Sequence, residues 1–445
     1  MYISQQIAAI AVSNVLAGRN LTLALPNALS SYPKATPQQR GAAADLSYGT
    51  LRFYGEVNAY LTQLLEKPLS NEHITALLLV AIYQLLHDKA DDFTVVNQAV
   101  KAAGDAKPRW AKGLVNGVLR NFLRQKDELK NKLKTNEIAL YSYPQWWIDK
   151  LKKQYPEQID AKYDMPASQY PCGFQTILKT GNLHPPLTLR VNIKKLSITD
   201  YLALLTKEGI EATHAGGQAV ILDKPIPVEK IPQFAEGVVS VQDYGAQLAA
   251  HLLGAPEGAR VLDACAAPGG KTGHILELAN VNLTAIDNDA QRLKRVADNL
   301  KRLDLSANLK VGDAAKPETW WDETTYDYIL ADVPCTASGI VRRHVDIKWL
   351  RRETDIATFT QQQSAILQQM WQCLAKKGKL LYVTCSIFNE ENQQQIDNFL
   401  QKNTDATQLP LLLTNDIDKN TQIAHGQLIP NAQHDGFFYA LLQKI

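Results

Sequence analysis

The chain has 445 residues, of which 45% are hydrophobic and 21% are charged, a composition typical of a folded protein with roughly two or three domains. The net charge of +2 conceals one local asymmetry, because residues 101–134 contain ten Lys or Arg and three acidic residues. No stretch approaches the apolar length of a membrane span, and the N-terminus lacks the layout of a signal peptide, so we expect a cytoplasmic protein.

The cysteines are odd in number and widely scattered, and no two of them form a C-x-x-C pair. They are Cys172, Cys265, Cys335, Cys373 and Cys385. This pattern favours neither a disulfide framework nor a zinc site. We therefore expect free thiols and no bound metal.

Helical periodicity runs through residues 1–128. Apolar side chains recur at helical spacing in the segments 3–16, 42–65, 74–86, 93–103 and 109–123. This pattern predicts an all-α bundle. Its last segment carries Lys112, Arg120 and Arg124 beside an apolar stripe. Such a basic face can bind phosphates, although the pattern alone favours a face that is merely solvated.

A polar, lysine-rich helical linker is expected over residues 129–165, followed by a small α/β domain over residues 166–237. The hydrophobic period changes to two in this domain. The expected elements are strands at 187–192, 211–214, 219–222 and 238–242 and a helix at 198–207. We expect an open sheet face from which Arg190 and Asn192 point toward a ligand.

Strands and helices alternate in the last domain, residues 238–445. The expected strands are 281–287, 307–313, 326–332 and 379–384, and the expected helices are 242–253, 289–303, 355–374 and 390–401. This alternation indicates an α/β fold with a parallel sheet covered by helices on both faces. Strands at 409–413 and 436–442 are expected to form an antiparallel edge hairpin. Residues 403–433 contain little other pattern.

One stretch organises this domain: a buried strand at Val261 runs into a glycine turn and a helix near Lys271. Glycines let the backbone approach a ligand, and a helix N-terminus favours an anionic group. The spacing matches neither the dinucleotide fingerprint nor the P-loop, which leaves another nucleotide-like ligand. Asp287, Asp313 and Asp332 end successive strands. A carboxylate there can accept ribose hydroxyls or an adenine amino group, although a lone one is as often a helix cap.

Two cysteines follow neighbouring strands, Cys335 after the strand that ends at Asp332 and Cys385 after the next one. Because neighbouring strand tips are one strand spacing apart, we expect both thiols to face one cavity. A disulfide and simple packing are the rival explanations. A thiolate suits attack on C6 of a pyrimidine, which makes C5 nucleophilic toward a sulfonium methyl group. Asp332 would then support the base, and the second thiol would remove the C5 proton.

These motifs resemble those of the RNA 5-methylcytosine methyltransferases. The resemblance is carried by CAAPGGKT (265–272), DVPCTASG (332–339), RRHVDIKW (342–349) and TCSI (384–387). The chain is most similar to the bacterial Sun/Fmu type, whose NusB-like domain resembles AKGLVNGVLR (111–120). TLRVN (188–192), VSVQD (239–243) and HDGFFYA (434–440) agree as well. The resemblance implies a NusB-like bundle, a small RRM-like domain and a Rossmann-like class I S-adenosylmethionine-dependent methyltransferase sheet.

The resemblance also implies roles for single residues. Cys385 would be the nucleophile, Cys335 would assist proton removal and enzyme release, and Asp332 would contact both base and cofactor. S-adenosylmethionine would be bound by Cys265, Ala266, Ala267, Pro268, Gly269, Gly270, Lys271, Asp287, Asp313 and Asp332. For this type the implied reaction is methylation of C5 of cytosine 967 of 16S ribosomal RNA, in the conventional rRNA numbering.

Basic residues near the site are assigned to RNA phosphates, with a solvated loop as the alternative. They are Arg342, Arg343 and Lys348, together with Lys112, Arg120 and Arg190. We expect a monomer. Two other functions stay open: an RNA-binding protein whose sheet domain binds the cofactor without turnover, and a methyltransferase acting on adenine amino groups. The paired cysteines argue against the first, and DVPC in place of an Asn/Asp-Pro-Pro-aromatic tetrad argues against the second.

Overall fold

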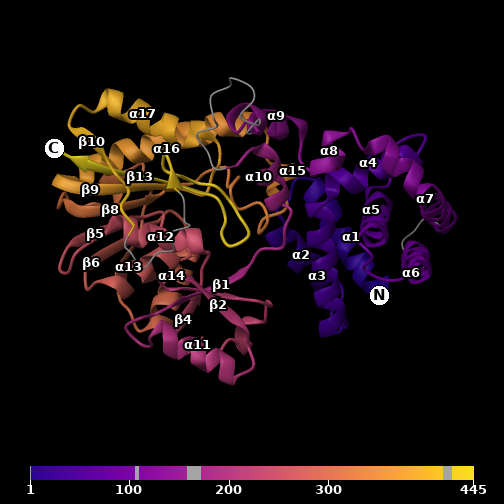
Figure 1. The fold of residues 1–445 in the computed structure, drawn as a ribbon, viewed down its shortest axis with the longest axis horizontal. Helices are drawn as coiled ribbons and strands as arrows, with labels where there is room; N and C mark the ends of the chain where they lie inside the picture. The colour runs from indigo at the N-terminus through magenta and orange to yellow at the C-terminus, as the bar shows by residue number, and fades with distance from the viewer. Residues whose placement is uncertain (1, 106–109, 158–171, 414–422) are drawn as a thin grey trace, which may run out of the picture. The chain divides into compact units, whose positions relative to one another are not determined.

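The structure is a computed structural model that describes residues 2–105, 110–157, 172–413 and 423–445 (Figure 1). The chain forms two compact units. The helical unit comprises Met1–Glu157, Phe174–Leu183 and Val341–Glu353, and the sheet unit contains the rest of the described chain. Within the described residues, no helix combines the length and the apolar character needed to span a bilayer. A segment from the C-terminal half of the sequence therefore folds with the N-terminal helices.

The helical unit is built around one buried helix, α5. Its helices are α1 (Tyr2–Leu16), α2 (Leu21–Ser30), α3 (Pro37–Arg52), α4 (Tyr54–Leu64), α5 (Glu72–Leu86), α6 (Asp92–Asp105), α7 (Ala111–Leu133), α8 (Glu137–Tyr141), α9 (Gln145–Gln154), α10 (Phe174–Thr180) and α15 (Ile347–Leu350). Every residue of α5 from Ala76 to Leu85 is buried. A helix that is apolar all round must be covered on all sides, and α1, α3, α4, α6 and α7 pack against it. The predicted all-α bundle is confirmed.

The observed helices differ from the sequence pattern in three places. The helix expected over 42–65 is split at Phe53, whose φ of −109° and ψ of 23° interrupt the helical backbone. The pattern did not indicate α2, in which an internal Pro26 obscures the helical signal. Helix α7 runs past residue 123 to Leu133, because buried Leu129 and Leu133 continue its apolar stripe. The expected linker over 129–165 therefore begins inside a helix.

Part of that linker, residues 158–165, lies outside the described residues, as do the first residues of the expected small domain, 166–171. Beyond them the small domain contains a four-stranded antiparallel sheet in the order β2-β3-β1-β4. Its elements are β1 (Leu187–Val191), β2 (Ala212–Gly216), β3 (Ala219–Leu222), β4 (Val239–Val241) and α11 (Ile198–Lys207). The predicted α/β arrangement is confirmed, but β4 pairs with β1, so the sheet extends beyond the expected boundary at residue 237.

The large sheet has the strand order β11-β12-β13-β9-β8-β5-β6-β7, with β10 paired to β13. Its strands are β5 (Arg260–Ala264), β6 (Asn282–Asp287), β7 (Asn308–Val311), β8 (Tyr326–Asp332), β9 (Leu374–Thr384), β10 (Ala406–Leu409), β11 (Ile423–Ala424), β12 (Gln427–Leu428) and β13 (Phe437–Lys444). The strands from β9 to β7 run parallel, and β13 pairs antiparallel with both β9 and β10. The expected strand over 436–442 corresponds to β13, but the strand expected over 409–413 is wrong, because β10, the partner of β13, ends at Leu409. β11 and β12 lie between β10 and β13 in the chain, so the two strands pair without forming a simple hairpin.

Helices cover both faces of this sheet (Figure 1). They are α12 (Tyr244–Leu253), α13 (Gly270–Leu278), α14 (Ala290–Leu303), α16 (Glu353–Cys373) and α17 (Gln393–Lys402). Alternate strand residues enter different cores: Val261 packs with α12, α13 and α14, whereas Leu262 packs with α16 and α17. This period of two places one face of each strand under each helical layer. The predicted Rossmann-like sheet is confirmed.

The segment Val341–Glu353 is tied into the helical unit by buried hydrogen bonds. Lys348 Nζ donates to the carbonyl oxygen of Arg52 and to Asn182 Oδ1, both at 2.7 Å. Because burial removes its hydration, the pKa of Lys348 falls well below its ordinary value. The sequence alone had placed this lysine at the protein surface, but it is a structural side chain of the interior.

Lys348→Ala should lower the free energy of unfolding by about 2–4 kcal/mol, because it removes the donor from one buried and one half-buried acceptor and leaves a cavity. Denaturant unfolding followed by far-UV circular dichroism measures this loss. The matched control is Lys132→Ala, because Lys132 is half exposed and pairs with Glu128 at the surface. Its effect should stay within about 0.5 kcal/mol. Equal losses in the two variants would contradict the structural role of Lys348.

Candidate active site

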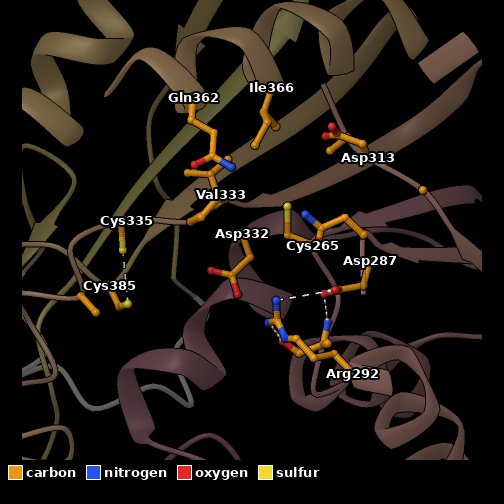
Figure 2. A pocket seen from close by; sticks show the side chains of 16 residues that line it. Cys265, Asp287, Arg292, Asp313, Asp332, Val333, Cys335, Gln362, Ile366 and Cys385 are labelled. Carbon is orange, nitrogen blue, oxygen red and sulfur yellow. Dashed lines mark hydrogen bonds and ion pairs between the residues drawn. The ribbon is translucent and has the colours of Figure 1, made fainter. Parts of the chain in front are cut away.

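The carboxyl ends of the parallel strands meet at one cavity in the sheet unit (Figure 2). Its volume is about 270 Å³. Strand β5 reaches it through the glycine loop, β6 through Asp287, β8 through Asp332 and β9 through Cys385. Ligands of open parallel sheets bind at this edge, so the cavity is the candidate site.

The glycine loop between β5 and α13 lies against α14 at the level of the backbone. Gly269 has a φ of 94°, and a Cβ there would lie 3.1 Å from both Cα and Cγ1 of Val296. Asn299 Nδ2 donates to the carbonyl oxygen of Pro268 at 2.9 Å. Helix α13 then begins at Gly270. Glycine suits this turn because its φ is positive and a side chain would press against α14. The loop reaches the cavity through Cys265 and Ala267, and Gly269 and Gly270 do not line it.

Two aspartates shape the end of the cavity near β6 and β7. Asp287 is buried, and its Oδ2 accepts a hydrogen bond from the Ala267 amide at 3.1 Å. The guanidinium of Arg292 lies 3.5 Å from Asp287 Oδ1. Asp313 also lines the cavity, and its Oδ1 accepts from the Ala315 amide at 2.9 Å. Both carboxylates are thus held in place by backbone amides at the strand ends.

An ion pair orients Asp332 in the middle of the site. Lys271 Nζ lies 2.7 Å from Asp332 Oδ2. Burial opposes the charge of Lys271, but attraction to Asp332 and the hydrogen bond between them outweigh it, so the pKa of Lys271 is raised. Nearby, burial raises the pKa of Asp263 to about 7, although the Thr272 hydroxyl donates to it at 2.6 Å. The site therefore presents a carboxylate with an ammonium proton donor beside it.

Cys335 and Cys385 lie together at the end of the cavity opposite Asp313 (Figure 2). Their Sγ atoms are 3.4 Å apart, and both are free thiols, so the rival disulfide is not formed. The hydrogen bond with Cys385, together with burial, raises the pKa of Cys335 well above its ordinary value. Cys335 is 8% exposed, whereas Cys385 is only partly buried. Cys335 therefore keeps its proton while the sulfur of Cys385 is the more open to a ligand.

The other described cysteines have a different setting. Cys265 lines the cavity, but burial raises the pKa of its thiol, which disfavours a nucleophilic role. Cys373 is the last residue of α16 and is fully buried in the core. In the described part of the chain, no group of three or more His, Cys, Asp or Glu residues is arranged to hold a metal ion. Thiol chemistry at this site therefore belongs to Cys335 and Cys385.

Arg190 does not face an open sheet surface, contrary to the prediction. Its Nε and Nη2 donate to the two carboxylate oxygens of Glu277 at 2.8 and 2.7 Å. Its Nη1 donates to the carbonyl oxygen of Gly270 at 2.7 Å and also to Gln242. Arg190 lies on β1, Gly270 and Glu277 lie on α13, and Gln242 lies before α13 in the chain. The buried Arg190 side chain therefore connects the small sheet to α13. Its predicted contact with RNA phosphate is therefore wrong.

Two other predicted phosphate contacts are corrected in the same way. Arg342 is 1% exposed and Lys348 is fully buried, and both belong to the helical unit. Arg343 is half-buried and stays a prediction. Charged side chains usually lie at the surface, so a basic run after the DVPC motif resembled a solvated phosphate-binding loop. Lys112 and Arg120, in contrast, are exposed on α7.

Several residues that line the cavity were not predicted from the sequence, among them Arg292, Gln362 and Ile366. Arg292 lies in the first turn of α14, beside the strand tip that ends in Asp287. Gln362 and Ile366 are one helical turn apart on α16, which crosses the sheet from a distant part of the sequence (Figure 2). Their spacing is visible in the sequence, but only the packing of α16 shows that this face borders the cavity.

Family models match three parts of the chain. Residues 250–443 match 16S rRNA methyltransferase RsmB/F, residues 3–124 match the NusB family, and residues 163–229 match the ferredoxin-like domain of the RsmF/B-like methyltransferases. The crystal structure of PH0851 has the same fold, with a TM-score of 0.75, 23% identity and 99% of each chain covered. A methyltransferase homolog from Pyrococcus horikoshii has a TM-score of 0.55 and 25% identity, covering 70% of this chain and 98% of that chain. The fold and site thus define an rRNA methyltransferase of the RsmB/F class.

Similar chains extend over the whole sequence. Ribosomal RNA small subunit methyltransferase B of Photorhabdus laumondii is 40% identical, over 100% of this chain and 99% of the relative. The protein of the same name from Yersinia enterocolitica is also 40% identical, with the same coverage. The chain belongs to the family of ribosomal RNA small subunit methyltransferase B.

Replacing both Lys112 and Arg120 by Gln should weaken RNA binding and lower the slope of log affinity against log salt by about one to two, because each phosphate contact releases counterions. A salt titration of RNA binding by fluorescence anisotropy measures the slope. Lys130→Gln with Lys132→Gln on the same helix is the charge-matched control. If neither pair of substitutions changes the slope, the basic face of α7 is exposed to solvent and does not contact RNA phosphates.

Proposed function

We propose that this protein transfers the methyl group of S-adenosylmethionine to C5 of cytosine 967 of 16S ribosomal RNA. The observation that carries the proposal is the contact between two free thiols, 3.4 Å apart, in the same cavity as Asp332. The names of the relatives support a small-subunit rRNA substrate. The position 967 rests on the motif resemblance. We propose that the enzyme acts as a cytoplasmic monomer.

The residues of the cavity fit S-adenosylmethionine. Asp287 at the tip of β6 would accept hydrogen bonds from the ribose hydroxyls, and Asp313 would accept one from the adenine amino group. Val333 and Ile366 supply apolar walls for a flat ring. When bound, S-adenosylmethionine supplies an electrophilic methyl group on a positively charged sulfonium, which suits a cavity lined by several carboxylates.

Cys385 is assigned as the nucleophile. Its sulfur is the more exposed of the two and lies 3.4 Å from the Cys335 thiol, which keeps its own proton and can donate a hydrogen bond to an attacking thiolate. Addition of that thiolate forms a sulfur–carbon bond at C6 of cytosine and moves an electron pair toward C5. C5 then has the electron density needed to take an electrophilic methyl group.

Asp332 and Lys271 would stabilise the charge that this addition creates on the base. A carboxylate can only accept, so Asp332 would receive a hydrogen bond from the exocyclic amino group of cytosine. The N3 atom of neutral cytosine is itself an acceptor, so its hydrogen must come from elsewhere. The Lys271 ammonium, 2.7 Å from Asp332, is the nearby proton donor. The pair thereby stabilises the adduct more strongly than the free base.

Cys335 is assigned to the release step. Once Cys385 is bonded to C6, its sulfur no longer accepts the hydrogen bond that keeps the proton on Cys335. Cys335 can then give that proton to water and accept the proton from C5. The electron pair of the C5–H bond forms the C5–C6 double bond, the sulfur–carbon bond breaks, and Cys385 leaves as a thiolate.

Cys335→Ala should accumulate a covalent protein–RNA adduct, because methyl transfer proceeds but the C5 proton is not removed. Incubation with S-adenosylmethionine and a 16S rRNA fragment, followed by denaturing electrophoresis, should show a slow-migrating band. Cys385→Ala and the double variant should show neither this band nor methyl transfer, while still binding the cofactor.

Two results would contradict these roles. One is undiminished turnover in Cys385→Ala, which removes the thiol nucleophile. The other is the absence of a slow-migrating band from Cys335→Ala, because a stalled release step should leave the protein bonded to the RNA. The Cys373→Ala variant is the control for loss of a buried thiol away from the cavity.

A further inference from the structure

One buried carboxylate joins the two loops that carry the cysteines. Glu391 lies in a short turn after β9 and is 0% exposed. Its Oε1 accepts a hydrogen bond from the Thr336 amide at 2.8 Å, and its Oε2 accepts from the Thr336 hydroxyl at 2.5 Å. The same Oε2 accepts from the Ser386 hydroxyl at 2.5 Å. Thr336 directly follows Cys335, and Ser386 directly follows Cys385. Glu391 therefore binds both loops at the residue next to each thiol.

A third contact brings in the strand tip before Cys335. Gln363 Nε2 donates to Glu391 Oε1 at 3.1 Å and to the carbonyl oxygen of Pro334 at 2.9 Å. Gln363 is itself fully buried on α16. Residues on both sides of Cys335 are thus held, directly or through one amide, by the same carboxylate.

Further bonds draw the loops together around this carboxylate. The Ser338 and Ser386 hydroxyls are 2.9 Å apart, and the Ile387 amide donates to Ser338 Oγ at 2.9 Å. The Gly339 amide donates to the carbonyl oxygen of Cys385 at 2.8 Å. A Cβ on Gly339 would lie 3.0 Å from that carbonyl oxygen. The loops therefore touch through backbone as well as side chains, with Glu391 at the buried base of the contact.

The stability of the fold does not by itself explain why a carboxylate occupies position 391. Burial raises the pKa of Glu391 above its ordinary value, although its hydrogen bonds act in the opposite direction. A buried carboxylate loses its hydration, and apolar groups of similar volume often fill such a site at no loss of stability. What apolar groups do not supply is several directional bonds that fix two loops at a defined separation.

We propose that Glu391 is a positioning residue that holds the Cys335 and Cys385 sulfurs in contact. It does not line the cavity, and it holds the two cysteine loops through Thr336, Ser386 and Gln363. The effect on turnover rests on the proposed function, whereas the effect on thiol geometry does not. Without Glu391 the loops separate, the hydrogen bond between the thiols weakens, and the two steps assigned to the cysteines slow together.

The test compares full-length Glu391→Gln and Glu391→Ala with the parent protein. A glutamine keeps the shape but offers one accepting atom where the carboxylate offers two. We expect kcat to fall about 10-fold in Glu391→Gln and about 100-fold in Glu391→Ala, the scale of a 1 Å misplacement. KM for RNA and for S-adenosylmethionine should change less than about twofold, because neither binding surface is altered.

A second readout needs no turnover. Treatment of the resting protein with diamide, which takes up the two electrons and two protons of a thiol pair, forms the disulfide between Cys335 and Cys385. Mass spectrometry of the linked peptide gives its rate. Both variants should form this disulfide several-fold more slowly than the parent. The control is Gln395→Ala, because Gln395 is buried nearby but donates to the carbonyl oxygen of Thr360, away from both loops.

The proposal would be overturned if folded Glu391→Ala formed the disulfide and turned over substrate at the rates of the parent protein. If that variant does not fold, Thr336→Val combined with Ser386→Ala removes the two hydroxyl donors while keeping the carboxylate. Parent disulfide rates in this double variant would also overturn it. A Cys385→Ala protein that still turns over would contradict the proposed function alone, since the disulfide assay judges Glu391 without reference to methyl transfer.

Discussion

The parallel pairing of β8 with β9 is the constraint on which the site depends. Its register sets Asp332 opposite Val383, so the two strands end level with each other. Cys335 and Cys385 follow these ends and meet at 3.4 Å, although 50 residues separate them. A slip of one residue would turn the side chains of one strand to the other face of the sheet and separate the thiols. The contact between the two thiols thus depends on the register of the sheet, and the surroundings of each cysteine depend on the other.

Buried charges also connect segments within each of the two compact units. Arg190 and Glu277 join the small sheet to the helix that follows the glycine loop, Lys348 ties a C-terminal segment into the helical unit, and Glu391 joins the two cysteine loops. Each makes several directional bonds to backbone or side-chain atoms, which apolar packing does not provide. Charged residues of the kinds that bind ligands at a surface therefore have a structural role here. The carboxylates and thiols that line the cavity are a separate group of residues.

Much of the sheet and of the site could be predicted from the sequence, because period and strand-end chemistry are local signals. The predicted strand 326–332 and helix 198–207 have the bounds of β8 and α11, and the strand-tip residues Asp287, Asp332 and Cys385 line one cavity. Other features depend on tertiary packing. Nothing local distinguishes buried Lys348 or Arg190 from a surface charge. Strands β11 and β12 are two residues long, too short to show a period, and the contribution of α16 to the cavity follows only from how it packs.

The proposed mechanism requires that Cys385, and not Cys335, forms the bond to the base. The direct measurement traps the protein on RNA whose target cytosine carries fluorine at C5, since fluorine cannot leave as a proton and the adduct persists. Digestion and tandem mass spectrometry then identify the peptide that carries the nucleotide. We expect a methylated fluorocytidine on Cys385 and an unmodified Cys335 peptide. A nucleotide on Cys335, or methyl transfer with no cross-linked peptide, would contradict the proposed mechanism.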